Sequence, residues 1–420
     1  MTDPAPGRLR DHPHALRLQV ANTIDGLGTY VGLAALIVMG YHSTLLLGTA
    51  MVLAAHILPG LLVAFFVAPR LQHRQRRPLL LMTNALGVLA LVPAIAAPSG
   101  ATAILAAALL GATSVATRGV QMAALAEAVP ASVRGRFYGV AGSFSQGVQV
   151  VGLAGGGAIA AALSPRAALL IDAGSFTVAA LVIATIRFAR VVPVRAATSP
   201  RPVMGSALQV VWSNPLLRML ACVTWLGALA GTVPEIASPA VTSTNLLPMV
   251  MAASPAGGAV AALVGTRLGI FSRVVDTLRL AVVSGASLML LGGGMYAAMA
   301  YPADSVTRAL YGVLANALIG GLWVWFLGMM TAFAEYTPPT ETVAVGSFMS
   351  WSVGAASGVG GFVVALLGVA GGYTALGLLL LPAAMWGLRL VTPAMPLSMG
   401  MPNADADHPG SPGTGVVPPS

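Results

Sequence analysis

The 420-residue sequence contains no lysine, because all 21 of its basic residues are arginine. The phosphate-binding loop of an ATP-driven pump needs a lysine, so this class is excluded. The single cysteine, Cys222, excludes an intramolecular disulfide. No histidine, cysteine or acid has the spacing of a metal site, and no catalytic triad is apparent. We therefore expect no enzyme, no metal and no cofactor.

Charge of either sign is also scarce. Only 8% of the residues are charged and 57% are hydrophobic, with a mean hydropathy of +0.86. Soluble proteins carry about 25% charged residues, so a soluble fold is excluded. The net charge of +9 would suggest nucleic acid in a soluble protein. Most arginines, however, lie in predicted cytoplasmic segments, which is typical of proteins that span the cell membrane. We expect lipid contacts and no nucleic acid.

The segment from Arg134 to Phe176 shows the pattern that recurs along the chain. Two arginines precede a long apolar stretch, a turn follows at Ser164-Pro165, and a second apolar stretch carries Asp172. The first stretch exceeds the roughly 20 residues that cross a bilayer. We predict a membrane-spanning hairpin with its arginines in the cytoplasm. The spacing Gly152-x-x-x-Gly156 predicts a face on which helices pack closely.

The apolar segments fall into two groups of six. They cover residues 14–40, 43–68, 79–97, 101–124, 137–163 and 167–188, and then 215–233, 246–265, 278–300, 309–333, 343–369 and 373–390. We predict an all-α integral membrane protein with twelve transmembrane helices and both termini in the cytoplasm. The predicted parts are a polar segment (1–13), a bundle (14–188), a cytoplasmic linker (189–214), a second bundle (215–392) and a disordered tail (393–420).

The two groups resemble each other at an offset of about 200 residues. The arginine loop at Arg70 recurs near Arg267, and the glycine-rich helix 5 recurs as a helix with Gly354-x-x-x-Gly358. Many secondary transporters are built from such duplicated bundles, with the substrate site near the midplane between them. The pattern therefore predicts two pseudo-symmetric six-helix bundles, with these glycines as packing positions.

Four short motifs carry a family resemblance. They are Ile-Asp-Gly-Leu at 24–27, the segment 128–136 with its Arg-Gly-Arg, Leu-Ile-Asp-Ala-Gly-Ser-Phe at 170–176, and Asn-Pro-Leu-Leu-Arg at 214–218. Together they resemble the major facilitator superfamily, in the branch of drug and siderophore exporters that includes enterobactin exporters and macrolide efflux proteins. This resemblance implies the superfamily fold and efflux by antiport.

The resemblance also implies a gating loop after the second helix, formed by Gln72, Arg76 and Arg77. The family usually has an aspartate where this chain has Gln72, and that aspartate latches the inner gate. Because this acid is missing, the sequence does not determine how the inner gate is latched. Arg118-x-x-Gln121 fits a helix 4 motif of the family, but we interpret it as a chance match because it lies near the cytoplasmic end.

Asp25 is the first candidate for the proton carrier. A charge in the bilayer centre costs about 2.5–3.5 kcal/mol, so such an acid normally faces a cavity or a partner. Loss of hydration favours its neutral form and makes protonation near neutral pH possible. The alternative is a helix contact in which Asp25 pairs with an arginine such as Arg118. For Asp172 we expect an outer-surface ion pair with Arg166 or a helix cap.

The candidate cavity residues are polar or aromatic residues of helices 1, 4, 7 and 10, as the resemblance implies, together with two glutamines of helix 5. They are Asn22, Tyr30, Gln146, Gln149, Trp225, Glu235, Asn316, Trp323 and Trp325. Each tryptophan could instead be an interfacial or packing residue. Glu235, next to Pro234, could belong to an outer gate or recognise a cation, or it could be a solvated loop acid.

These features predict a monomeric secondary transporter that exports a small hydrophobic or amphipathic compound in exchange for protons by alternating access. Two alternatives stay open. The first is uptake or facilitated diffusion of a metabolite. The second is a non-transporting membrane receptor or scaffold, which the loss of the acid at Gln72 favours.

Overall fold

The computed structural model describes residues 13–67, 74–128, 131–186, 188, 200–242, 245–268, 274–302, 304–322, 325–337 and 341–391, and the regular structure of these residues is entirely helical. The helices are α1 (Pro13–Phe66), α3 (Arg76–Ala96), α4 (Gly100–Ala128), α5 (Ala131–Ala162), α6 (Pro165–Ala184), α7 (Pro200–Ser213), α8 (Pro215–Gly231), α9 (Val233–Val241), α10 (Leu247–Leu268), α11 (Val274–Ala298), α12 (Val306–Leu322), α13 (Trp325–Tyr336) and α14 (Thr342–Val391). Among the described residues, eight helical segments are long and apolar enough to cross a membrane. The predicted tail lies outside the described residues.

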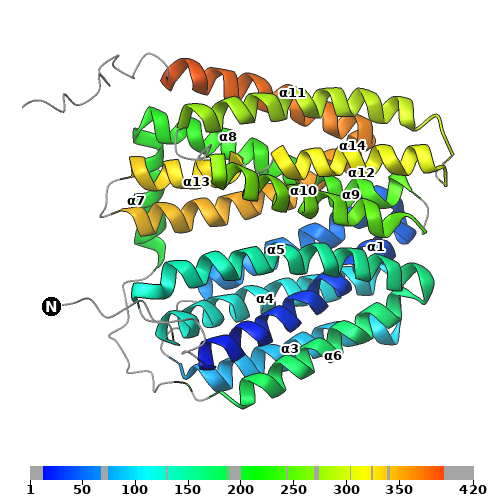
Figure 1. Ribbon diagram of the computed structural model, residues 1–420, viewed down its shortest axis with the longest axis vertical. Coiled ribbons are helices and arrows are strands. Elements are labelled where there is room, and N and C mark those ends of the chain that lie inside the picture. The colour runs from blue at the N-terminus through cyan, green and yellow to red at the C-terminus, as the bar shows by residue number, and fades with distance from the viewer. Residues whose placement is uncertain are drawn as a thin grey trace, which may run out of the picture.

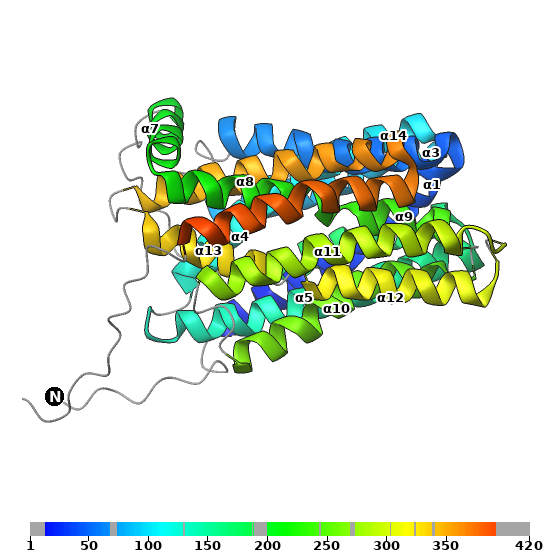
Figure 2. The same cartoon turned by 90° about the horizontal axis from the view of Figure 1, so that it is seen from above.

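The longest helices, α1 and α14, each contain a reversal of the chain. A straight helix of 54 residues, the length of α1, would measure about 80 Å, far more than a hydrocarbon core of about 30 Å. The helical geometry of α1 is interrupted at Thr44 and Leu45. In α14 it is interrupted at Gly368, whose φ of +73° glycine adopts without steric cost. Figure 2 shows the orange and red parts of α14 meeting at one end of the bundle.

The helices form two bundles (Figure 1). One contains α1, α3, α4, α5 and α6, and the other contains α8 to α14. The helix α7 lies at the end of the molecule where α1 begins and α14 ends. The sequence predicted a linker here, and the structure shows that residues 200–213 of this linker are helical.

The same close contacts between helices occur within each of the two bundles. A Cβ atom on Gly111 of α4 would overlap the carbonyl oxygen of His56 in α1, and one on Gly320 of α12 would overlap that of Ser254 in α10. Two further glycines, Gly156 of α5 and Gly360 of α14, meet the backbones of α1 and α8 in the same way. The matching glycines are about 200 residues apart, as expected of duplicated bundles.

Gly111→Ala is therefore expected to destabilise the first bundle. The added methyl group cannot displace the backbone carbonyl of His56 without separating α1 from α4. The matched control is Gly174→Ala, because Gly174 of α6 is exposed and has no atom within 4 Å of the new Cβ. Alanine favours a helix over glycine by up to about 1 kcal/mol, so the control should unfold at the same temperature or higher. Equal thermal unfolding midpoints for both variants in detergent would contradict this packing.

The two bundles meet at the end opposite α7. Gly361 of α14 faces Ala50 of α1 and Ile236 of α9, and Gly157 of α5 faces Pro248 of α10. Ala50 lies shortly after the break in α1, and Gly361 lies seven residues before the break at Gly368. These contacts close this end of the interface, which continues along α1 and α14 where Leu58 and Leu61 face Gly358 and Gly354.

The seventh predicted span is longer than expected. The sequence placed its end at Val233, but α8 is followed directly by α9, and the apolar span runs from Pro215 to Val241. Pro234 occupies the first turn of α9, where a missing N–H group leaves no hydrogen bond unmade. The predicted end agrees with the end of α8 to within two residues, and what the prediction did not include is the continuation of the span through α9.

Candidate functional site

Asp25 lies within α1, about 18 Å along the helix from Pro13 at 1.5 Å per residue. Its Oδ1 atom is buried and has no hydrogen-bond partner. The side chain of Gln121, on α4, lies beside the carboxyl group, and Arg118 of the same helix acts on it electrostatically. Of the motif interpreted above as a chance match, Gln121 therefore lies beside Asp25, and Arg118 is near enough to act on it electrostatically.

The first bundle contains several buried polar atoms without a hydrogen-bond partner. Among the described residues of the first bundle they are Asn22 Oδ1, Asp25 Oδ1, His56 Nδ1, Asn84 Oδ1, Gln121 Nε2 and both carboxyl oxygens of Asp172. Burying a polar group without a hydrogen bond costs free energy, so such groups call for a proton, water or a ligand. Arg118 also acts electrostatically on Tyr30 and His56.

Asp172 does not have either of the roles expected for it. Its side chain is 0% exposed, whereas Arg166 is exposed, and neither carboxyl oxygen has a hydrogen-bond partner. The N-cap of α6 is Ser164, whose hydroxyl accepts a hydrogen bond from the amide of Ala167 at 3.1 Å. The expectation of a surface ion pair or cap was wrong because α6 turns this acid toward α1.

Glu235 lies in the first turn of α9, between residues of both bundles. It acts electrostatically on Tyr30 of α1 and on Tyr373 of α14. Its Oε2 atom is buried and has no partner. Glu235 therefore belongs to a helix and not to a loop, and it stands where the two bundles meet.

Asn316 is buried in a hydrogen-bond network inside the second bundle. Its Nδ2 donates to Ser238 Oγ at 3.1 Å and to the Val250 carbonyl at 3.0 Å, and its Oδ1 accepts from the hydroxyl of Tyr373 at 3.1 Å. The network joins α9, α10, α12 and α14. In this structure Asn316 is 2% exposed, and its side-chain amide is hydrogen-bonded to neighbours within its own bundle.

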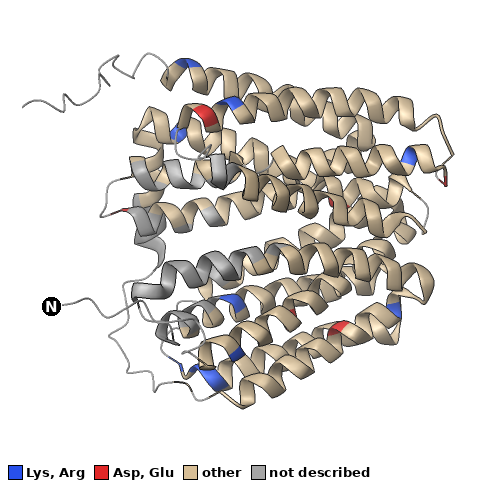
Figure 3. Ribbon diagram, viewed as in Figure 1, with Lys and Arg blue, Asp and Glu red and all other residues tan. Residues whose placement is uncertain are grey.

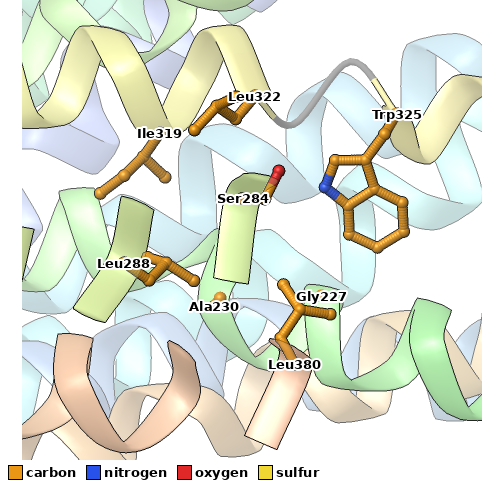
Figure 4. Close-up of a pocket in the computed structure, with 8 residues that line it drawn as sticks. All are labelled: Gly227, Ala230, Ser284, Leu288, Ile319, Leu322, Trp325 and Leu380. Carbon is orange, nitrogen blue, oxygen red and sulfur yellow. The ribbon is translucent and has the colours of Figure 1, made fainter. Parts of the chain in front are cut away.

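The two described tryptophans among the candidates lie in different surroundings. Trp225 of α8 donates to Ser352 Oγ at 2.8 Å, and its ring lies 5.8 Å from that of Trp212. Trp325 of α13 is 1% exposed and lines a pocket within the second bundle (Figure 4). The other lining residues are Gly227, Ala230, Ser284, Leu288, Ile319, Leu322 and Leu380. This pocket is apolar and does not reach the first bundle.

The remaining candidates are only partly described. Gln72 and Trp323 lie outside the described residues, as does the side chain of Gln146. Gln149 is half-buried on α5. In the gating loop region, Arg76 is buried at the start of α3 and Arg77 is exposed.

The four predicted packing glycines lie against α1. Cβ atoms on Gly152 and Gly156 of α5 would lie 2.6 Å from Tyr30 Cβ and from the Val31 carbonyl. Gly354 and Gly358 of α14 face Leu61 and Leu58 in the second part of α1. The first pair thus packs inside one bundle, and the second pair packs between the bundles.

Sequence reasoning gave too little weight to Arg118 and Gln121. Their spacing places both on one side of α4, and the match to a family motif was visible in the sequence. The interpretation as a chance match rested on its nearness to the cytoplasmic end. A helix of 29 residues, the length of α4, carries that position about 15 Å into the bundle from Ala128.

Comparison with known proteins identifies the family. Residues 20–359 match the family model of the Major Facilitator Superfamily. Two structures of the nucleoside transporter NupG, one of them a mutant, have TM-scores of 0.63 and 0.66 at 14% identity, covering 90% of this chain and 97% and 98% of NupG. A D-xylose-proton symporter has a TM-score of 0.64 at 14% identity, covering 89% of this chain and 97% of the symporter. A search of curated proteins finds no match. This multi-pass membrane protein belongs to the major facilitator superfamily.

Proposed function

We propose that the chain exports a small hydrophobic or amphipathic compound, such as a drug, antibiotic or siderophore, in exchange for protons by alternating access. The observation that carries this proposal is Asp25, a buried acid with an unpartnered oxygen beside Gln121 and Arg118 of another helix. An acid in this position can change its protonation state when water reaches it. Asp25 is the proposed proton carrier.

The proposed topology has twelve spans. The breaks in α1 and α14 divide each into two spans, and α8–α9 and α12–α13 each count as one. Most of the blue ribbon lies at the end of the molecule near α7 (Figure 3). Arg166 and Arg308 lie in the first turns of α6 and α12. Because basic residues favour the cytoplasm, the α7 end, where α1 begins and α14 ends, is assigned to the cytoplasm.

The proposed substrate path lies between the bundles and is closed at the outer end in this state. Tyr30 and Glu235 stand at this interface, and Asn22 and Gln149 lie on helices of the first bundle that border it. On the side of the second bundle the proposed lining residue is Trp225, which is half-buried on α8. Asn316 and Trp325 would reach it only if their helices rearrange, because both are now buried within the second bundle.

Uptake in symport with protons is the second candidate. It is supported by the likeness in fold to the D-xylose-proton symporter. The two candidates differ in the sign of the pH gradient that drives accumulation. An antiporter accumulates substrate in vesicles with an acidic lumen, whereas a symporter needs an acidic exterior, and this holds for either orientation of the protein.

The test uses proteoliposomes at zero membrane potential with ethidium, uridine and D-xylose as probes. We expect ethidium to accumulate when the lumen is acidic and neither sugar-containing probe to move. Accumulation of uridine or D-xylose with an acidic exterior would replace export by uptake. No flux of any probe under either gradient, with intact thermal unfolding, would favour a non-transporting role.

A further inference from the structure

Asp172 is a second acid in the first bundle whose carboxyl oxygens have no partner. Two glycines of α1 leave the space in which its carboxyl group lies. A Cβ atom on Gly28 would lie 3.0 Å from Asp172 Oδ1, and one on Gly32 would overlap Oδ2. The carboxyl group therefore spans one turn of α1, in a space that exists because both residues lack side chains. The hydroxyl of Ser175 donates to the backbone carbonyl of Asp172 at 2.7 Å, so it leaves the carboxyl oxygens without a partner.

Asp25 lies on the same side of α1. It precedes Gly28 by three residues, which is about 4.5 Å along the axis, and residues three or four apart share a helix face. Oδ1 of Asp172 thus lies about one helix turn from Asp25. The two acids act on each other electrostatically.

No cation among the described residues is seen to compensate Asp172. The helices packed against α6 are α1, α3 and α5. On α1, Asp25 is the titratable group that acts on it. On α3 the charged residues are Arg76 and Arg77, in the first turn. The described side chains of α5 include no charged or titratable group. On α6 itself the other charged residue is Arg166, which is exposed.

We propose that Asp172 is the second carboxyl group of a proton-binding pair with Asp25, so that the pair holds the transported proton. Two carboxylates close together in a poorly hydrated site disfavour joint ionisation, and their protons are lost in steps that belong to the pair. Transfer within the pair breaks the O–H bond of one carboxyl group and forms that of the other. The inference rests on the proposed proton coupling.

The first test follows the carbonyl stretch of protonated carboxylic acids by infrared difference spectroscopy during a pH titration of the reconstituted protein. We expect Asp172→Asn to remove one component, and Asp25→Asn to shift the midpoint of the component that remains. The control is Asp304→Asn, which changes an exposed acid before α12 in the same way. The proposed pair is refuted if Asp172→Asn leaves the titration unchanged. It is also refuted if Asp25→Asn does not shift the midpoint of the Asp172 component.

Gly32→Ala keeps both acids and serves as a second variant. Its methyl group would overlap Asp172 Oδ2, so it should shift the titration midpoint without removing a component. Gly174→Ala, on the exposed side of α6, should leave the titration unchanged.

The second test measures ethidium accumulation. Asp172→Asn should lower pH-driven accumulation by about tenfold or more, since a change of about one pKa unit in the remaining acid alters its proton affinity tenfold. Exchange of ethidium at equal pH on both sides should continue, whereas a merely structural role of Asp172 would impair both processes. Absence of pH-driven accumulation in the wild type refutes the proposed function. The infrared titration then still tests whether Asp25 and Asp172 form a proton-binding pair. If the wild type accumulates ethidium and Asp172→Asn accumulates it equally well, the proposed pair is refuted but the proposed function is not.

Discussion

Asp25→Asn is expected to reduce pH-driven ethidium accumulation in proteoliposomes to the level of protein-free liposomes. Asparagine has nearly the same size and can still hydrogen-bond the side chain of Gln121, but it cannot bind and release a proton. Exchange of ethidium at equal pH should persist, because it needs the substrate path but no net proton movement. Full pH-driven accumulation by the variant would remove Asp25 from the proposed role.

The same variant separates the transport role from the structural alternative, in which Asp25 only holds α1 against Gln121 and Arg118 of α4. A structural contact would lower the thermal unfolding midpoint and impair exchange at equal pH as well. The matched control is Asp304→Asn, at an exposed position that has no part in the site. This control should transport and unfold like the wild type.

A disulfide between the bundles is expected to abolish transport reversibly. A Cβ atom built on Gly361 lies 3.4 Å from Cβ of Ala50, near the roughly 3.5–4.5 Å between the Cβ atoms of a disulfide. In a Cys222→Ser background, Ala50→Cys with Gly361→Cys should cross-link on oxidation and hold the outer end closed. Ethidium flux should then stop, and reduction should restore it.

The control for the disulfide is a pair within one bundle. A Cβ atom built on Gly321 of α12 lies 3.7 Å from Cβ of Ala261 in α10, so Ala261→Cys with Gly321→Cys links two helices that both belong to the second bundle. Oxidation of this pair should leave most of the flux intact. Equal flux with and without the cross-link between Ala50 and Gly361 would contradict alternating access between the bundles.

The helical architecture could be predicted from the sequence because a bilayer imposes a minimum length on each apolar segment. The glycine pattern also pointed to duplication, since Gly156 and Gly360 each bring a helix against a neighbouring backbone. The continuation of the seventh span through α9 could not be predicted in the same way. Pro234 is compatible both with the end of one helix and with the first turn of the next, and only the three-dimensional path decides between them.

The site was predicted less completely than the fold. Asp25 stood out because an acid within an apolar span is costly wherever it points. The surroundings of Asp172 depend on which face of α6 meets α1, and Gly28 and Gly32 do not reveal in the sequence that they make room for a carboxyl group. Similarly, the sequence identified Asn316 as polar within a span but not its partners Ser238 and Tyr373 on other helices.

The movement of protons against substrate tests the central claim most directly. Proteoliposomes contain a pH-sensitive dye in the lumen, are held at zero membrane potential, and receive ethidium outside. We predict that the lumen becomes more alkaline as ethidium enters, and that Asp25→Asn shows no change in lumen pH. Entry of ethidium into wild-type vesicles without a change in lumen pH, or with acidification, would contradict proton-coupled export.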